Sequence, residues 1–538
     1  MLIFTKFYNF EFSFFIGYVK INNREKYGVN MMDLLNKEKT ILEVISGVYI
    51  FILILIFPLM VDKTGFFHIL EHKWYSYVTI ASVYLITCLI VFLYFLIIKK
   101  VNYFKNYKFS LVQILAVSFL GLNILSCFLS PYFKTHNLFI GVGRGEGLIV
   151  SSLYILTFLF ITFFAKFQKR YISYFSIASI LISFIEILQY IGFNPFNMYQ
   201  GGIGTHNVSF MGTIGNIDFI SAMYCILLPI SFSAFIFLDE NKYLKLTHLL
   251  SLLMGSFIFG IINVQSGKVA YLVILLLTFP FILVNNKRLS RFLITISTIL
   301  TAYCINIIIN PEYHYDLGRV NLYFQFNFLT LMFIIVIGLL IYLSTILKKT
   351  PYDLKNNYSY LKKYYLILGI GLVFSLVALY FINVSSGMLY EIHELLHGNF
   401  DDTFGTYRIF LWKRTLTLIN QYPIFGSGPD TFALRFMAKY TADVAAIGPL
   451  TINDTAANVY LTMLINLGVI GLGNYLLFLF FQVKEGIKNV NQYSIILLIT
   501  LLCYLVQDFF NLSVVIVSPI FWLLMGLHYI SINEKANN

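Results

Sequence analysis

Residues 75–98 read YSYVTIASVYLITCLIVFLYFLII, a run of 24 residues without a charged side chain. An α-helix rises about 1.5 Å per residue, so this run is long enough to cross the roughly 30 Å hydrocarbon core of a bilayer. Comparable apolar runs recur along the chain and are separated by short polar connections. The pattern predicts an all-α fold, a polytopic bundle of about 12–14 transmembrane helices.

The composition excludes several other classes of protein. Of 538 residues, 59% are hydrophobic and only 12% are charged, whereas a soluble protein carries about 25% charged residues. A soluble enzyme, a coiled coil, a disordered chain and an outer-membrane barrel are therefore ruled out. The net charge of +12 resides mostly in short loops, where Lys and Arg set orientation, so we expect a lipid bilayer and no nucleic acid as partner.

The apolar runs give fourteen candidate spans and an orientation. With the N-terminus inside, the short inner loops carry 19 Lys and Arg and the short outer loops carry 6, a bias that places both termini in the cytoplasm. Abundant Phe, Ile, Tyr, Lys and Asn are typical of AT-rich bacterial genomes, so we expect a multi-pass protein of a bacterial inner membrane. The spans are 41–60, 75–98, 110–130, 147–165, 171–191, 217–238, 246–264, 268–284, 291–309, 327–347, 364–383, 458–481, 493–510 and 513–531.

One connection is much longer than the others. Residues 384–457 form a polar segment on the predicted outer face, with a helix-like stretch over 406–421 and a Pro/Gly-rich turn at 422–429. A connection of this length inside a compact domain is usually functional. The predicted organisation is a cytoplasmic N-terminal segment (1–40), eleven spans (41–383), a large structured extracytoplasmic loop (384–457), three spans (458–531) and a cytoplasmic tail (532–538).

The beginning of the chain has two further features. Met31 and Met32 open a polar stretch, as expected if translation starts there rather than at Met1. The first long apolar run begins near Ile41, so no cleavable signal peptide is expected. The five cysteines all fall inside apolar runs, and we interpret them as packing residues.

Glycine-rich stretches gather on the predicted outer face, at 141–147, 212–216 and 265–268. Glycine lets the backbone approach a ligand closely, and Arg144 and Lys268 beside two of these stretches suit a phosphate. Each cation alone also fits a side chain that snorkels to the interface. Together they predict an anionic ligand at the outer membrane surface, and a diphosphate on a lipid carrier fits.

The order of these motifs resembles the bacterial O-antigen ligase and O-antigen polymerase-like superfamily. Residues 138–147 (LFIGVGRGEG) resemble its Arg-x-Glu-Gly element, and residues 212–219 (GTIGNIDF) resemble its Gly-Thr-x-Gly-Asn element. The most specific part is 402–412 (DTFGTYRIFLW), continuing through Pro423 to Phe432. The resemblance covers roughly residues 130–475.

The resemblance implies a metal-independent glycosyl transfer without a cofactor on the outer face, in surface polysaccharide assembly. A glycan would leave an undecaprenyl-diphosphate carrier and join an acceptor glycan or protein. Arg144 and Arg408 match the family's basic positions, and Lys268 stands where the family usually has an arginine. These three would bind the diphosphate, with Arg414 and Asp454 close by, and Trp412 and Asn458 would shape the acceptor side.

The chain departs from the family at one position. The family pattern reads approximately Asp-x-Ala-His-Asn-x-Tyr-Leu, whereas residues 454–461 read DTAANVYL, which places Ala457 where the histidine is expected. Three explanations stay open: a divergent enzyme with another base, an inactive homologue that still binds lipid-linked glycan, or a deliberately substituted chain. The candidates for another base are His206 and Asp454.

Two other functions compete with glycan transfer. His393, Glu394 and His397 fit the His-Glu-x-x-His pattern of zinc proteases, but the motif has only three fixed residues, and an amphipathic loop helix explains them better. Glu186, Gln189 and Asp508 lie inside apolar spans, and intramembrane acids mark ion or proton paths by default. The alternative function is therefore a lipid-linked sugar flippase or another polytopic transporter.

Overall fold

The computed structural model describes residues 31–533 except 101–102, 105–106, 200–208, 315–318, 351–358 and 448–453. Eleven helical segments within these ranges are long and apolar enough to cross a membrane. They are α2 with its continuation (Asn36–Leu59), α3 with its continuation (Ile69–Ile98), α4 (Leu111–Leu129), α6 (Arg170–Tyr190), α7 (Ile217–Phe237), α8 (Lys242–Ile262), α9 (Gln265–Ile282), α10 (Asn286–Ile308), α11 (Phe328–Lys349), α12 (Ser359–Phe381) and α16 (Val459–Lys488).

Three shorter helices complete the bundle: α5 (Leu148–Phe164), α17 (Ser494–Asp508) and α18 (Ser518–Asn533). Each of the fourteen predicted spans overlaps one of these fourteen helices, and the polytopic all-α fold is confirmed. The last helix begins five residues later than the predicted 513, because Pro519 occupies its first turn, a position that favours helix initiation.

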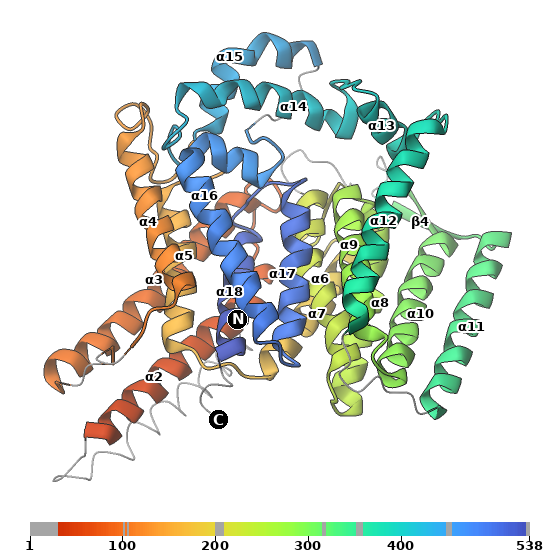
Figure 1. Cartoon of the computed structure of the whole chain (residues 1–538), viewed down its shortest axis with the longest axis horizontal. Coiled ribbons are helices and arrows are strands. Elements are labelled where there is room, and N and C mark those ends of the chain that lie inside the picture. Colours follow the sequence, from red (N-terminus) through yellow and green to blue (C-terminus); the bar gives the residue numbers. More distant parts are fainter. Residues whose placement is uncertain are drawn as a thin grey trace.

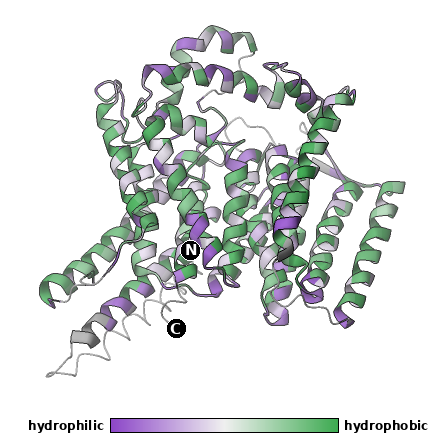
Figure 2. Cartoon of the chain, viewed as in Figure 1, coloured by the Kyte–Doolittle hydropathy of each residue, from purple (hydrophilic) through white to green (hydrophobic). Residues whose placement is uncertain are grey.

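Helix α7 lies at the centre of the bundle. Its side chains from Phe219 to Phe237 are buried, and it packs against α6, α8 and α17. In contrast, α12 is exposed along its apolar length, as expected for a helix in contact with lipid. Hydrophobic residues dominate the helices of the bundle, whereas hydrophilic residues concentrate at helix ends and in the connections (Figure 2).

Three helices from the segment 384–457 lie across one end of the bundle (Figure 1). They are α13 (Gly387–Leu396), α14 (Phe404–Leu418) and α15 (Phe432–Ile447), and we call them the cap helices. An apolar cluster that includes Phe410 and Phe436 joins α14 to α15 and extends to Ile465 on α16, so the cap helices share a core with this end of the bundle.

Helix α16 is interrupted at Gly468 (φ 70°, ψ −175°), and the turn 422–430 fills the interruption. A side chain at Gly468 would collide with the carbonyl of Ile424. Four backbone hydrogen bonds close the break: Val469 N–H to Pro423 (2.8 Å), Ile470 N–H to Ile424 (3.3 Å), Ser427 N–H to Ile465 (3.1 Å) and Gly428 N–H to Asn466 (2.9 Å). We call this interlocking of the turn with the interrupted helix the splice. It fixes the position of Asp430, the last residue of the turn.

Two antiparallel hairpins connect helices. One pairs β1 (Phe210–Met211) with β2 (Gly215–Asn216), and the other pairs β3 (Ile309–His314) with β4 (Arg319–Phe324) in the register Ile309↔Phe324 to His314↔Arg319. Sequence analysis predicted only a loop between the spans at 291–309 and 327–347. The aromatic and β-branched residues of β4 favour a strand, but the run is too short to distinguish from a loop by periodicity.

Candidate functional site

The glycine-rich loop 141–147 wraps around one carboxylate. Four successive backbone N–H groups donate to Asp430: Gly143 (2.9 Å), Arg144 (3.1 Å), Gly145 (3.1 Å) and Glu146 (3.3 Å). Such a run of converging amides is an anion-binding nest. Burial raises the pKa of Asp430 to about 6, against the lowering effect of these hydrogen bonds.

The loop glycines were predicted to let the backbone approach a ligand, but in the structure they let it approach the Asp430 carboxylate. A side chain at Gly141 would collide with the Asp430 carboxylate, and one at Gly147 would collide with the backbone of Ile140. The close backbone approach therefore serves an internal carboxylate, while the side chain of Arg144 remains for another partner. Asp430 lies 286 positions from Arg144, and no pattern in the sequence pairs the two.

Arg144 projects from this nest toward the segment before α16. Its Nε lies 2.8 Å from Asp454 Oδ2, and both side chains are 17% exposed. Its guanidinium lies 5.6 Å from the centre of the Phe219 ring on α7. The angle of the contact with Asp454 does not make it a hydrogen bond, so Arg144 Nε and Asp454 Oδ1 are both buried without a hydrogen-bond partner among the described residues.

Arg408 reaches the same region from the cap. Gly405, Thr406 and Tyr407 all have positive φ, between 58° and 64°, so a left-handed turn starts α14 and orients Arg408. Its Nε donates to the Phe510 carbonyl (3.0 Å) and one terminal nitrogen donates to the Gly405 carbonyl (2.8 Å). Burial lowers the pKa of its guanidinium, a sign of a partly dehydrated cation.

Asp218, at the start of α7, lies near the two arginines. Its carboxylate forms no ion pair with the described residues, but it lies close enough to Arg408 and Arg144 for their positive charges to act on it. Asn216 caps α7 by accepting the Asp218 N–H (2.8 Å), and Asn511 donates to the Asp218 carbonyl (3.0 Å). Three motifs from distant parts of the sequence, 141–147, 212–219 and 402–412, therefore meet around one acidic residue that sequence analysis did not select.

The segment 454–458 is held between the cap and α16. Trp412 donates from its ring nitrogen to the Ala456 carbonyl (3.0 Å) and packs against Phe509. Asn458 is buried and caps α16 by accepting the Leu461 N–H (2.9 Å). Both predicted acceptor-side residues thus shape this segment through internal contacts. Ala457 between them is partly exposed and has a φ of 47°.

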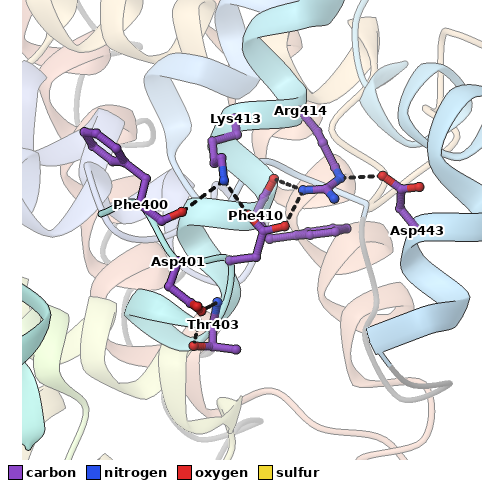
Figure 3. Close-up of polar contacts among 8 residues, drawn as sticks. Phe400, Asp401, Thr403, Phe410, Lys413, Arg414 and Asp443 are labelled. Atoms are coloured by element: carbon purple, nitrogen blue, oxygen red, sulfur yellow. Dashed lines mark hydrogen bonds and ion pairs between the residues drawn. The ribbon is translucent and has the colours of Figure 1, made fainter. Parts of the chain in front are cut away.

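Two predicted cations have other partners. Arg414 donates to Asp443 (2.7 Å) and Asp402 (2.9 Å), and its guanidinium lies 3.6 Å from the centre of the Phe410 ring (Figure 3). These contacts engage it within the cap. Lys268 donates to Asn263 at the turn between α8 and α9. The adjacent Gly267 packs against Ser221 on α7.

Other sequence candidates lie elsewhere. His206 lies outside the described residues. In the His-Glu-x-x-His stretch, His393 hydrogen-bonds to Glu394 (3.1 Å), and His397 bonds to the His393 carbonyl (2.8 Å) and stacks on Tyr380. Within the described ranges, no three His, Cys, Asp or Glu side chains are grouped to hold a metal ion.

The intramembrane polar residues of α6 support the turn at 212. Glu186 accepts a hydrogen bond from Tyr224 (2.5 Å) and contacts Gly212, and Gln189 accepts the Gly212 N–H (2.5 Å). These contacts give Glu186 and Gln189 a structural role in positioning the second motif. Asp508 is different, because it is buried at the end of α17 and makes no hydrogen bond or ion pair with the described residues.

Asp508 lies on the wall of a partly open cavity of about 120 Å³ that extends from the nest into the bundle. The cavity is bounded by α4, α5, α16, α17 and α18. Its lining includes the polar residues Arg144, Glu146, Asp430 and Asp508, together with Tyr475 and Trp522. Aromatic rings next to hydrogen-bonding groups are typical of small-molecule sites.

Taken together, the fold and the converging arginines define a polytopic helical membrane protein with a cation-containing site beneath a helical cap. The family model for O-antigen ligase matches residues 325–476, which include the whole cap and the break in α16. This match confirms the resemblance of the chain to the O-antigen ligase-like superfamily and supports a role in surface polysaccharide assembly. No curated protein matches the chain.

Proposed function

We propose that this chain transfers a glycan from an undecaprenyl-diphosphate-linked donor to an acceptor glycan or protein on the extracytoplasmic face of a bacterial inner membrane. The observation that carries the proposal is that Arg144 and Arg408 both lie close to the start of α7. Arg144 lies against the Phe219 ring, and Arg408 bonds to Phe510, next to Asn511, which donates to the Asp218 carbonyl. Two arginines on one side can each donate to a phosphate of the diphosphate, and arginine suits this role because of its planar, forked donor geometry.

In this scheme the carboxylates orient the arginines for the donor. Asp454 holds only the Nε of Arg144, which leaves the two terminal nitrogens to donate to a phosphate oxygen. Arg408 is anchored by two backbone carbonyls, so it has one terminal nitrogen left for the ligand. Lys268, in the first turn of α9, would add a positive charge as a point charge rather than a fork.

The acceptor would approach beside the segment 454–458. Trp412 and Asn458 shape this segment, and Arg414 supports it indirectly by joining α14 to α15. No imidazole occupies position 457, so the proposed transfer needs a different proton acceptor or a substrate-assisted route.

The proposed orientation places both termini in the cytoplasm and the cap outside. Single cysteines introduced at two exposed lysines test it, Lys134→Cys on the cap side and Lys166→Cys at the opposite ends of the helices. A membrane-impermeant thiol reagent should label the first variant in intact cells and the second only after permeabilisation. The reverse pattern would contradict the proposed sidedness.

The proposed transfer is tested in cells by Arg408→Ala. We expect surface glycan to disappear while the amount of protein in the membrane stays unchanged, because the hydrogen bonds that Arg408 makes with the described residues go to two backbone carbonyls at the surface of the bundle and in the cap, and not to the packing between spans. Arg170→Ala, at the exposed start of α6, is the matched control and should retain the glycan. Unchanged glycan in Arg408→Ala would refute the assignment, and lipid-linked units trapped on the inner leaflet upon loss of the protein would favour the flippase.

A further inference from the structure

The carboxylates around Arg144 differ in what they contact. Asp430 accepts four backbone N–H groups, Asp454 pairs with Arg144, and Asp218 lies near both arginines. Asp430 and Asp454 are therefore each engaged mainly through one oxygen, by the loop backbone and by Arg144 respectively. Contacts with amides or with a cation favour the charged form of a carboxylate and oppose its protonation, although burial has the larger effect on the pKa of Asp430.

The Glu146 carboxylate contacts neither a cation nor a backbone amide among the described residues. Its Oε1 accepts a hydrogen bond from the Tyr154 hydroxyl (2.9 Å) and its Oε2 accepts one from the Ser513 hydroxyl (3.0 Å). It makes no ion pair with the described residues. Two neutral hydroxyl donors hold the carboxylate in a fixed orientation and leave it a lone pair on each oxygen.

Glu146 also borders the cavity in which the donor would bind. It lines the cavity together with Arg144, which is the one cation among the described residues of that wall. The two side chains are two positions apart on a loop that the nest around Asp430 fixes. A sugar whose diphosphate is bound by Arg144 would therefore present its anomeric carbon close to the Glu146 carboxylate.

We propose that Glu146 is the group that accepts the proton of the acceptor hydroxyl in this chain. This inference rests on the proposed function. The acceptor O–H gives its proton to the Glu146 carboxylate as the acceptor oxygen bonds to the anomeric carbon of the donor. The bond from that carbon to the diphosphate oxygen breaks, the carrier diphosphate leaves with the electron pair, and Glu146 returns the proton to water.

The surroundings of Glu146 suit this role. Burial raises its pKa to about 7, the negative charge of Asp430 acts in the same direction, and the hydrogen bonds from Tyr154 and Ser513 oppose both. A general base works best when its pKa lies near the operating pH. The titratable groups that face it come from every neighbouring element: Tyr77 on α3, Tyr154 on α5, Asp430 after the spliced turn, and Tyr504 and Asp508 on α17.

The test measures release of the carrier diphosphate by the purified full chain in lipid nanodiscs. The probe is lipid-linked glycan extracted, together with its acceptor, from cells that lack the protein. We expect Glu146→Gln to lower kcat by at least about 100-fold, the lower end for loss of a general base, with KM for the donor changed less than about threefold. Glu146→Asp should recover part of kcat. Glu71→Gln, an exposed glutamate at the start of α3, is the matched control.

The pH profile separates a proton acceptor from a structural residue. In the wild-type chain, kcat should fall about tenfold per unit below a pH near 7, and Glu146→Gln should abolish this limb. Turnover of Glu146→Gln within threefold of wild type, parallel loss of donor binding, or loss of the limb in Asp508→Asn instead would overturn the inference. A wild-type chain that releases no carrier diphosphate would refute the proposed function, and with it this step.

Discussion

Removal of the Asp430 carboxylate should destabilise the protein through the loop it holds. In Asp430→Ala, the N–H groups of residues 143–146 lose their common acceptor. A buried donor left without a partner costs about 1–3 kcal/mol. Water reaches the exposed Gly143, and relief of the buried charge offsets part of the loss. We therefore expect the free energy of unfolding to fall by about 2–4 kcal/mol.

The conservative replacement and a matched control sharpen this prediction. Asp430→Asn keeps one acceptor oxygen and should lose roughly half as much stability. Asp443→Asn removes a carboxylate whose side chain is 42% exposed and paired with Arg414, and exposed ion pairs contribute at most about 1 kcal/mol. Denaturant unfolding of the detergent-solubilised protein, followed by tryptophan fluorescence, gives the three values.

Asp430→Ala should also impair function directly, because the nest sets the direction of the Arg144 side chain. Asp430→Ala should therefore lose glycan transfer even at a temperature where it remains folded. A loss of unfolding free energy below about 1 kcal/mol, no greater than that of Asp443→Asn, would refute the reasoning that the carboxylate organises the loop.

Three further predictions concern the splice, the intramembrane acid and pH. Gly468→Ala should destabilise the protein by about 2–3 kcal/mol, because φ is 70° and a side chain would collide with Ile424. Gly473→Ala, with open space around it, should be neutral or stabilising in the same unfolding assay. Equal effects of the two substitutions would contradict the splice. Tyr224→Phe should cost about 1–3 kcal/mol by leaving Glu186 without its hydroxyl donor, and a melting temperature equal to wild type would disprove this support. The folded-state pKa of Glu146 is raised to about 7 from 4.5, so the folded state binds the proton more tightly than the unfolded state. The contribution of Glu146 to stability is therefore present below pH 4.5 and is lost as pH rises to about 7. Glu146→Gln should flatten the dependence of stability on pH over that window, and an unchanged slope would contradict the raised pKa.

The fold was predictable because the signal is local. A run such as 217–238 specifies a membrane helix by its own length and hydrophobicity, and α7 spans 217–237. The hairpin of β3 and β4 was missed because six-residue strands carry little periodic signal. The helices of the cap were predicted only in part, since their burial depends on contacts with each other.

Candidate site residues could be selected from the sequence where the side chain itself is distinctive. They could not be selected where the contact is made by distant backbone groups. Arg144 and Arg408 stand out as cations in conspicuous motifs, and the structure brings both close to the start of α7. Asp430 was missed because it bonds to backbone amides far away in the chain, which leave no trace in residue identity. The prediction of Arg414 as a ligand residue did not foresee that Asp402 and Asp443 engage it, since ion pairing within the cap depends on tertiary structure.

The central claim is that Arg144 and Arg408 form the diphosphate site of a glycan transferase. The most direct measurement is transfer of lipid-linked glycan to acceptor by the purified protein, with the wild-type chain, Arg408→Ala and Ala457→His compared in one assay. We expect product with the wild-type chain, none with Arg408→Ala, and no requirement for the histidine. Product from Ala457→His alone would mean that the natural chain lacks a base, and product from Arg408→Ala at the wild-type rate would contradict the diphosphate site.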